Sequence, residues 1–318
     1  MANGDKFTGE IKQLENGFLF FKADYMADTV QLDWKRVDHV ESKDQFTVIL
    51  TGGARKTGFI EKNAEPDSST EGFAVKSEDS STLTRTANVV EIVPMNSSFW
   101  RQLRGSVSYG FTFTGGTNTT QSNLASDLTY QSEKWEAKFD GSSVFSRQNQ
   151  AESSGRNTIN FYYYRYRGRR WFVAGMAGFL SSKQQDLTAR ETLGTGIGLD
   201  LIQRSTSSLQ LVGGALFLNE KYAETVGGKS ERGSDGQVLL QYTKYRFTKF
   251  QFTTQLAAFP AINTPGRVRV SLQSYFKREL FKNFNLIFSV YENYDNRPPV
   301  LAKKNDFGTS TSIGWSFP

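Results

Sequence analysis

From about residue 100 to its end, the chain repeats one pattern, in which apolar and polar side chains alternate over long segments. The last segment shows the pattern most clearly. Every second residue from Phe307 to Phe317 is aromatic, Thr or Ile, and the residues between them are all Gly or Ser. A period of two is typical of a β-strand whose two faces meet different surroundings. The pattern therefore predicts an all-β fold for this part of the chain.

Twelve such segments follow one another, and most are longer than the usual strand of about five or six residues. A tilted strand of about ten residues is long enough to cross a bilayer. Short turns alternate with longer polar loops, as in transmembrane barrels. An even number of strands also places both ends of the barrel on one side of the membrane. The predicted strands are 102–114, 121–131, 134–147, 156–167, 169–182, 189–203, 208–222, 234–246, 249–260, 267–279, 282–294 and 305–317.

The two faces of these segments distinguish a membrane barrel from a soluble one. Leu103, Val107 and Phe111 share one face, opposite Arg104 and Ser106. In lipid the apolar face turns outward and the polar face lines the lumen, and the sheet must close because lipid cannot satisfy its edges. The alternative is an aromatic core inside a soluble β-sandwich. Aromatic residues near strand ends are predicted to form interfacial girdles; they are Trp135, Tyr162, Tyr164, Tyr166, Trp171 and Trp315.

The first 95 residues differ from the rest and contain a repeat. The segment GDKFTGEI, from Gly4, matches GARKTGFI, from Gly53, at an offset of 49 residues. The net charge is −5 over residues 1–95 and +11 over residues 96–318. We therefore predict a small duplicated, SH3-like β domain over 1–95 and a barrel over 96–318. The second repeat is preceded by a strand-like segment, QFTVIL, so we expect the natural chain to extend upstream of Met1.

The barrel region resembles a known family. The resemblance rests on GSVSYGFTFTGGTNTTQSNLASDLTY, YRYRGRRWF, DLTARETLGTGIGLDLI and LQLVGGALFLNEKY, spread over residues 100–318. These segments are similar to the salt-induced outer-membrane protein family, which corresponds to domain of unknown function 481. The resemblance implies a β-barrel in the bacterial outer membrane. It assigns no catalytic residues, because the biochemical role of the family is poorly defined.

Two groups of residues are candidates for function. The end of the chain resembles the C-terminal assembly signal of outer-membrane proteins, formed here by Ile313, Trp315 and Phe317, although Pro318 follows the final aromatic residue. Around the turn at Gly168 we predict that arginines point into the lumen and tyrosines point outward. Basic side chains that face the lumen would favour anions. The predicted lumen residues are Arg104, Arg165, Arg167, Arg267, Arg269 and Lys277.

Other chemistry is weakly supported by the sequence. The chain has no Cys, and its one His, His39, lies outside the predicted barrel. A serine nucleophile in the barrel would therefore lack the usual base. Three glycines in LGTGIGLD miss the G-x-G-x-x-G dinucleotide spacing, and we attribute them to lumen or strand packing. Four carboxylates are candidates to face the lumen, and oxygen ligands suit calcium, but no loop has EF-hand spacing; they are Asp127, Glu136, Asp140 and Asp200.

These observations predict a non-enzymatic outer-membrane protein without a cofactor, a metal or a nucleic-acid partner. Its expected partners are outer-membrane lipid, the barrel-assembly machinery and an envelope protein bound through residues 1–95, which are expected in the periplasm. One hypothesis is a narrow passive channel for small polar or anionic solutes. The other is a closed barrel that anchors a partner-binding periplasmic module.

Overall fold

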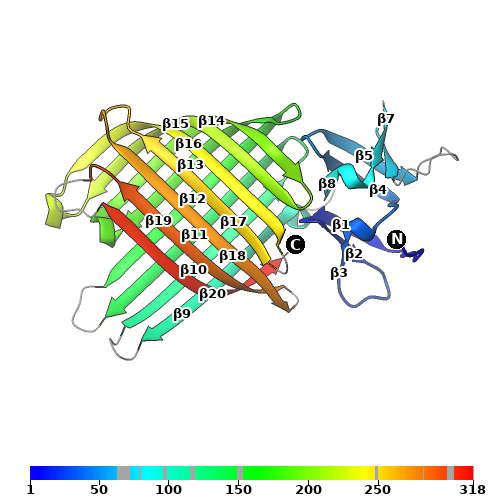
Figure 1. Cartoon of the computed structure of the whole chain (residues 1–318), viewed down its shortest axis with the longest axis horizontal. Helices are drawn as coiled ribbons and strands as arrows, with labels where there is room; N and C mark the ends of the chain where they lie inside the picture. Colours follow the sequence, from blue (N-terminus) through cyan, green and yellow to red (C-terminus); the bar gives the residue numbers. More distant parts are fainter. Residues whose placement is uncertain are drawn as a thin grey trace.

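The computed structural model describes residues 1–62, 72–78, 80–95, 99–114, 119–148, 153–247, 250–281, 283–298 and 304–317. The chain forms an eight-stranded N-terminal sheet and a separate, closed barrel of twelve antiparallel strands (Figure 1). The predicted all-β architecture is thereby confirmed. No helix in the described part of the chain is long and apolar enough to cross a membrane.

The N-terminal sheet has the strand order β3-β2-β1-β8-β4-β5-β6-β7. β1 pairs with β8, with Leu14 opposite Ile92. The elements are β1 Glu10–Glu15, β2 Phe18–Lys22, β3 Val30–Asp33, η1 Trp34–Arg36, β4 Ser42–Leu50, β5 Arg55–Lys62, β6 Gly72–Lys76, β7 Ser81–Arg85, η2 Thr86–Asn88 and β8 Val89–Pro94.

The two repeated units share this sheet and one hydrophobic core. In each unit three strands lead into a 3-10 helix, η1 or η2. The indole N–H of buried Trp34 donates to the carbonyl of Thr86 at 2.9 Å, and the Thr86 hydroxyl donates to the carbonyl of Asp38 at 2.9 Å. A buried Trp N–H needs such a partner, so these two bonds tie the units together. The core comes from both units and includes Leu14, Phe21, Phe46, Ile60, Phe73 and Ile92.

A short helix, α1 Phe99–Gln102, leads into the barrel. The strand bounds differ from the predicted bounds by at most four residues. The strands are β9 Leu103–Thr114, β10 Thr119–Gln131, β11 Trp135–Gln148, β12 Ser154–Arg167, β13 Trp171–Ser182, β14 Leu187–Arg204, β15 Ser207–Tyr222, β16 Ser230–Phe247, β17 Phe250–Pro260, β18 Val268–Phe281, β19 Phe284–Asp295 and β20 Asn305–Phe317.

The barrel closes where β20 pairs with β9, with Ile313 opposite Tyr109 and Phe317 opposite Gly105. Connections between strands span two or three residues at one end and four to nine at the other. The N-terminal sheet lies at the end with the short connections, which is also where β20 ends (Figure 1). We call this end the near mouth and the opposite end the far mouth.

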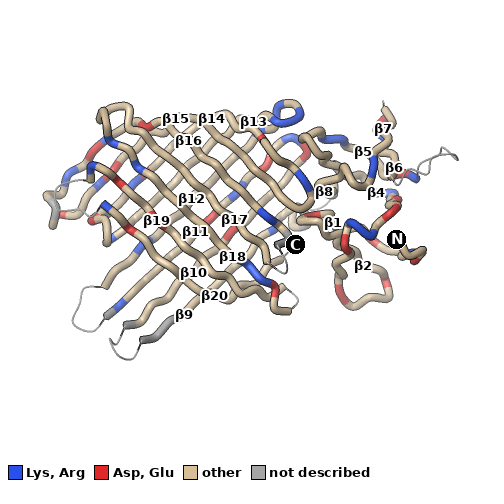
Figure 2. The backbone as a smooth tube through the Cα atoms, viewed as in Figure 1, with Lys and Arg blue, Asp and Glu red and all other residues tan. Residues whose placement is uncertain are grey.

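The outer face of the barrel carries an apolar band. Side chains such as Phe111, Leu193 and Phe217 are about 60% exposed, and they alternate with inward-facing small or polar residues. Charged residues gather toward the two ends of the barrel, with fewer along its middle (Figure 2). A closed barrel with an apolar outer band and a polar lumen is the architecture that spans a lipid bilayer.

Candidate functional site

The lumen is the candidate site, because the alternation brings polar side chains from all around the barrel into it. On β9 the lumen face carries Ser106 and Ser108, which are buried, and the outer face carries Tyr109 and Phe111, which are exposed. The carboxylates of Asp127, Glu136, Asp140 and Asp200 face the lumen, as expected, and each has a hydrogen-bond partner or ion-pair partner there.

The alternation on β12 has the opposite phase to the predicted one. Ile159 and Phe161 are 49% and 47% exposed on the outer face, and Arg165 and Arg167 share that face and are also exposed. Tyr162, Tyr164 and Tyr166 point into the lumen, where Tyr164 contacts Phe172. The prediction that Arg165 and Arg167 line the lumen is therefore wrong. So is the placement of these three tyrosines in an outer girdle.

Aromatic residues do form an outer ladder near the N-terminal sheet, from different positions. The rings of Phe99 and Tyr130 stack with centroids 5.0 Å apart, Tyr130 stacks on Trp135 at 5.2 Å, and Trp135 stacks on Tyr163 at 5.9 Å. Arg165 and Arg167 follow Tyr163 on the same outer face. At this level of a barrel, long basic side chains reach the polar headgroup layer, which explains their exposure without a lumen role.

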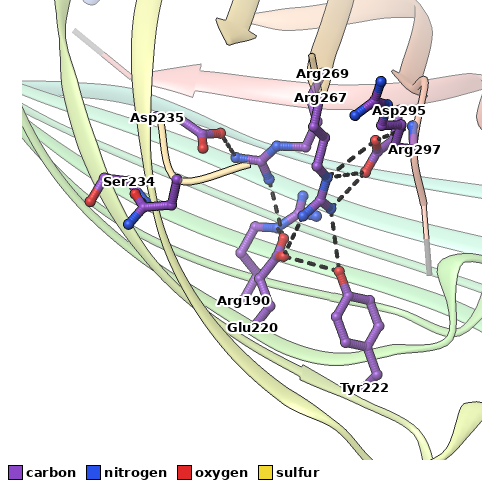
Figure 3. Close-up of polar contacts among 10 residues, drawn as sticks. Arg190, Glu220, Tyr222, Ser234, Asp235, Arg267, Arg269, Asp295 and Arg297 are labelled. Atoms are coloured by element: carbon purple, nitrogen blue, oxygen red, sulfur yellow. Dashed lines mark hydrogen bonds and ion pairs between the residues drawn. The ribbon is translucent and has the colours of Figure 1, made fainter. Parts of the chain in front are cut away.

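Near the far mouth, arginines and carboxylates form one ion-pair network (Figure 3). Glu220 on β15 lies at its centre, with its oxygens 2.6 Å from Arg190, 3.3 Å from Arg267 and 3.3 Å from Arg269. Arg267 also pairs with Asp295 at 2.7 Å, and Arg269 also pairs with Asp235. The Tyr222 hydroxyl donates to Glu220 at 3.0 Å. We call Arg190, Glu220, Asp235, Arg267, Arg269 and Asp295 the far-mouth network.

This network contains two of the predicted lumen arginines and shows that they are compensated. Three guanidinium groups face three carboxylates, and the side chain of Glu220 is only 5% exposed. A further pair, Arg156 with Asp306 at 2.5 Å, joins β12 to β20. Because their charge is neutralised by partners, Arg267 and Arg269 do not form the free basic ring that an anion-selective filter needs.

The network borders a cavity of about 160 Å³ in the far half of the lumen. Its walls come from β12 to β19. One side is apolar, with Leu180, Leu216 and Leu239, and another carries the amides of Gln255, Gln273 and Asn293. The Nδ2 atom of Asn293 is buried and has no hydrogen-bond partner among the described residues.

The N-terminal sheet covers the near mouth through polar contacts. The Arg55 guanidinium lies 3.7 Å from the centre of the Tyr166 ring, which is a cation–π distance. Arg104, predicted to line the lumen, does so at this end, where it pairs with Glu15 at 3.0 Å and donates to Gln131. Gln131 in turn donates to Glu91 at 3.2 Å.

Two details show how closely the sheet approaches the barrel. Gly53 has a φ of +84°, and a Cβ there would lie 1.4 Å from the carbonyl oxygen of Arg169; only glycine fits this turn. Burial raises the pKa of the Glu91 carboxyl above its ordinary value, although Arg104 acts in the opposite direction.

A second cavity, of about 90 Å³, lies between the two parts, with Arg55 and Glu91 on one side and Tyr166, Asp200 and Gln241 on the other.

Aromatic side chains lie between the two cavities, which share no lining residue. Tyr162 lines the first cavity and Tyr166 the second, and Tyr164 between them stacks parallel to Tyr162 with centroids 6.2 Å apart. Phe172 is 1% exposed and packs over Gly198, where a Cβ would lie 2.1 Å from its ring. The glycines of LGTGIGLD thus allow close packing. We call Tyr162, Tyr164, Tyr166 and Phe172 the tyrosine layer. The Lys138 ammonium group lies 5.4 Å from the centre of the Tyr164 ring and extends this layer.

The remaining predicted residues are placed as follows. Lys277 faces the lumen and donates to the Ser316 hydroxyl at 2.8 Å. Ile313 and Trp315 are 57% and 47% exposed on the outer face of the closing strand, and Pro318 lies outside the described residues. His39 belongs to the N-terminal sheet, where its ring contacts the carbonyl of Gly72. The described residues contain no group of three or more His, Asp or Glu able to hold a metal ion.

Comparison with known proteins assigns the family. The profile of the family described as "Protein of unknown function, DUF481" matches residues 107–317, which is most of the barrel. The chain belongs to this family. No curated protein matches the chain.

Several solved structures are similar to this DUF481 protein. The translocator domain of the autotransporter NalP from Neisseria meningitidis is 14% identical, with a TM-score of 0.39, over 68% of this chain and 87% of that one. The NanC porin is 12% identical, with a TM-score of 0.40, over 68% and 99%. The β domain of the Bordetella autotransporter BrkA is 11% identical, with a TM-score of 0.38, over 68% and 98%.

Proposed function

We propose that this DUF481 protein is a channel in the bacterial outer membrane that admits small polar solutes and is closed at its near mouth by the N-terminal sheet. One observation carries the proposal: the lumen holds two cavities, one in its far half with a polar and an apolar wall, and one beneath the N-terminal sheet that is lined by polar side chains. A barrel that served only as an anchor would need no cavity bordered by so many hydrogen-bonding groups.

The orientation follows from the connections. In outer-membrane barrels the short connections face the periplasm and the long ones face outside. The N-terminal sheet lies at the end with the short connections, so we place it in the periplasm. Solutes would reach the larger cavity from outside, and passage onward would require movement of the tyrosine layer and of the N-terminal sheet.

The charge compensation in the far-mouth network favours uncharged solutes over anions. Each of its arginines has a carboxylate within 3.3 Å, so an anion would have to compete with a preformed ion pair. We therefore expect little selectivity between cations and anions in reversal-potential measurements, in place of the anion preference that the sequence predicts.

A second candidate function is a closed barrel that anchors the N-terminal sheet for an envelope partner. The observation in its favour is the covered near mouth, where Arg55, Glu15 and Glu91 of the sheet contact the barrel. The same contacts provide the test. Arg55→Ala removes the cation–π contact with Tyr166, and Lys56→Ala, one residue away, is a matched control.

The experiment is single-channel recording of the refolded full chain in a planar bilayer, after its heat-modifiable gel mobility has shown that it is folded. If the sheet closes a channel, wild-type protein should conduct rarely, and Arg55→Ala should raise its open probability several-fold while Lys56→Ala does not. A folded barrel that carries no current in all three forms would rule out the channel and favour the anchor.

A further inference from the structure

We infer that the larger cavity binds a small uncharged polyol, of the size and chemistry of a monosaccharide. The inference rests on the proposed channel function and names the class of solute. The cavity measures about 160 Å³, well below the ~300–1,000 Å³ of sites for drug-sized ligands. It lies behind the far-mouth network, where a solute arriving through the long-loop end would first be enclosed.

The polar wall of the cavity carries several amides beside its charged and hydroxyl side chains. Asn160, Gln237, Gln255, Gln273 and Asn293 come from five different strands and converge on it. An amide both donates and accepts hydrogen bonds, and so does a hydroxyl group, so a ring of amides suits a ligand with many hydroxyls.

One of these amides has an unused donor. The Asn293 side-chain oxygen accepts from the Ser271 hydroxyl at 2.9 Å, which fixes the orientation of the amide. Its Nδ2 is buried without a partner among the described residues. Buried polar groups are almost always hydrogen-bonded, so this donor indicates a place for a ligand hydroxyl or for the water that the hydroxyl would replace.

The charges around the cavity indicate a neutral ligand. Three arginines line the cavity, and each is already paired: Arg156 with Asp306, Arg190 with Glu220, and Arg269 with Asp235 and Glu220. Asp295, which also lines it, is paired with Arg267. A carboxylate or ammonium group on the ligand would have to break one of these pairs or remain unpaired, and a buried unpaired charge is strongly unfavourable. A hydroxyl group meets neither obstacle.

The other wall matches the apolar face of a sugar ring. Leu180, Leu187, Leu216 and Leu239 come from the adjacent strands β13 to β16, and Leu216 is 2% exposed. A pyranose presents C–H groups on its faces and hydroxyls around its edge. A pyranose placed between the leucines and the amides would bury its C–H groups against apolar side chains, and its hydroxyls would form hydrogen bonds with the amides.

The test is saturation-transfer NMR with glucose on the full chain, refolded in a detergent that has no sugar headgroup. Glucuronate, which has the same ring with one carboxylate, is the matched probe. We expect saturable glucose binding, with glucuronate at least about tenfold weaker. Asn293→Leu and Gln255→Leu should each weaken glucose binding about 3- to 10-fold, the effect of one lost hydrogen bond, while Gln241→Leu, in the second cavity, should leave it unchanged.

The inference is overturned if glucose does not bind, if glucuronate binds equally well or better, or if neither cavity variant weakens glucose binding. Gel mobility before and after heating shows which variants are folded, and two independent variants keep the test valid if one fails to fold. Conductance separates this inference from the channel proposal. A chain that binds glucose but carries no current retains the site and loses the channel, whereas one that conducts without binding glucose loses only the site.

Discussion

Replacing Glu220 by Gln should destabilise the barrel substantially, because one carboxylate holds three arginines. Its oxygens contact Arg190 at 2.6 Å, Arg267 at 3.3 Å and Arg269 at 3.3 Å, and its side chain is 5% exposed. Gln keeps the size of the side chain and removes its charge. The change therefore tests the electrostatic contribution of the far-mouth network with little alteration in packing.

The size of the effect follows from what each arginine retains. Arg267 keeps Asp295 and Arg269 keeps Asp235, whereas Arg190 has no other carboxylate partner among the described contacts. Removing one partner of a buried ion pair costs about 3–5 kcal/mol. Because two of the three arginines stay paired, we expect the lower end, about 3 kcal/mol of unfolding free energy.

The assay is reversible urea unfolding of the full chain in lipid vesicles, followed by heat-modifiable gel mobility. Glu191→Gln is the control, since this exposed carboxylate on the adjacent strand only accepts a hydrogen bond from Asn219 at 2.9 Å. The double variant Arg190→Gln with Glu220→Gln should recover much of the loss, because no unpaired guanidinium remains. A loss below about 1 kcal/mol, equal to that of the control, or strict additivity in the double variant would refute the reasoning.

Three further predictions concern other parts of the molecule. Burial raises the pKa of Glu91, so the protonated carboxyl is favoured when the N-terminal sheet is docked on the barrel. The stability of docking should therefore fall as pH rises from the ordinary carboxyl pKa through the raised value. Limited proteolysis across pH 4 to 8 should show this dependence in the wild type and not in Glu91→Gln. Gly198→Ala should destabilise the barrel by about 1–3 kcal/mol in urea unfolding, because the new Cβ would lie 2.1 Å from the Phe172 ring, and Phe172→Leu should partly rescue it. If Ile313, Trp315 and Phe317 form the assembly signal, then Trp315→Ser should slow insertion catalysed by the assembly machinery much more than Trp171→Ser, a similarly exposed tryptophan elsewhere on the outer face; equal rates would contradict that role.

The barrel could be predicted from sequence because its determinants are local. Strand length and the period of two persist through every strand, and turn residues mark the ends. The phase of the alternation was harder to assign where both faces carry amphipathic side chains. In YYYRYR, both Tyr and Arg are compatible with the lumen and with the membrane interface, so these residues alone do not determine which face of the strand lines the lumen. The information lay upstream in the same strand, where Ile159 and Phe161 place the odd-numbered positions, and hence Arg165 and Arg167, on the outer face.

Pairing between distant strands could not be predicted in the same way. The sequence does not mark Glu220, Asp235 and Asp295 as members of a network, because a lone carboxylate in a strand carries no sign of the arginine that it will meet. Their phase was a usable signal, since each falls on the polar face of its strand close to a long connection. The docking of the N-terminal sheet had no such signal. It depends on a turn at Gly53 that fits against Arg169, and both residues look like ordinary turn residues in the sequence.

The positions of the charges suggest how one lumen can be both stable and selective. Ion pairs occur at the two mouths, in the far-mouth network and between Arg104 and Glu15. Arg267 and Arg269 reach Glu220 on β15 from the region of β18, so the far-mouth network links parts of the barrel that are not neighbours in the sheet and holds this end in shape. The cavity between the far mouth and the tyrosine layer is lined by amides and leucines, and also by three arginines that are already paired with carboxylates. A charged solute would compete with the pairs that hold the barrel, whereas an uncharged one would meet groups that have hydrogen bonds to offer. Selection against charge would then be a direct consequence of how the barrel is stabilised.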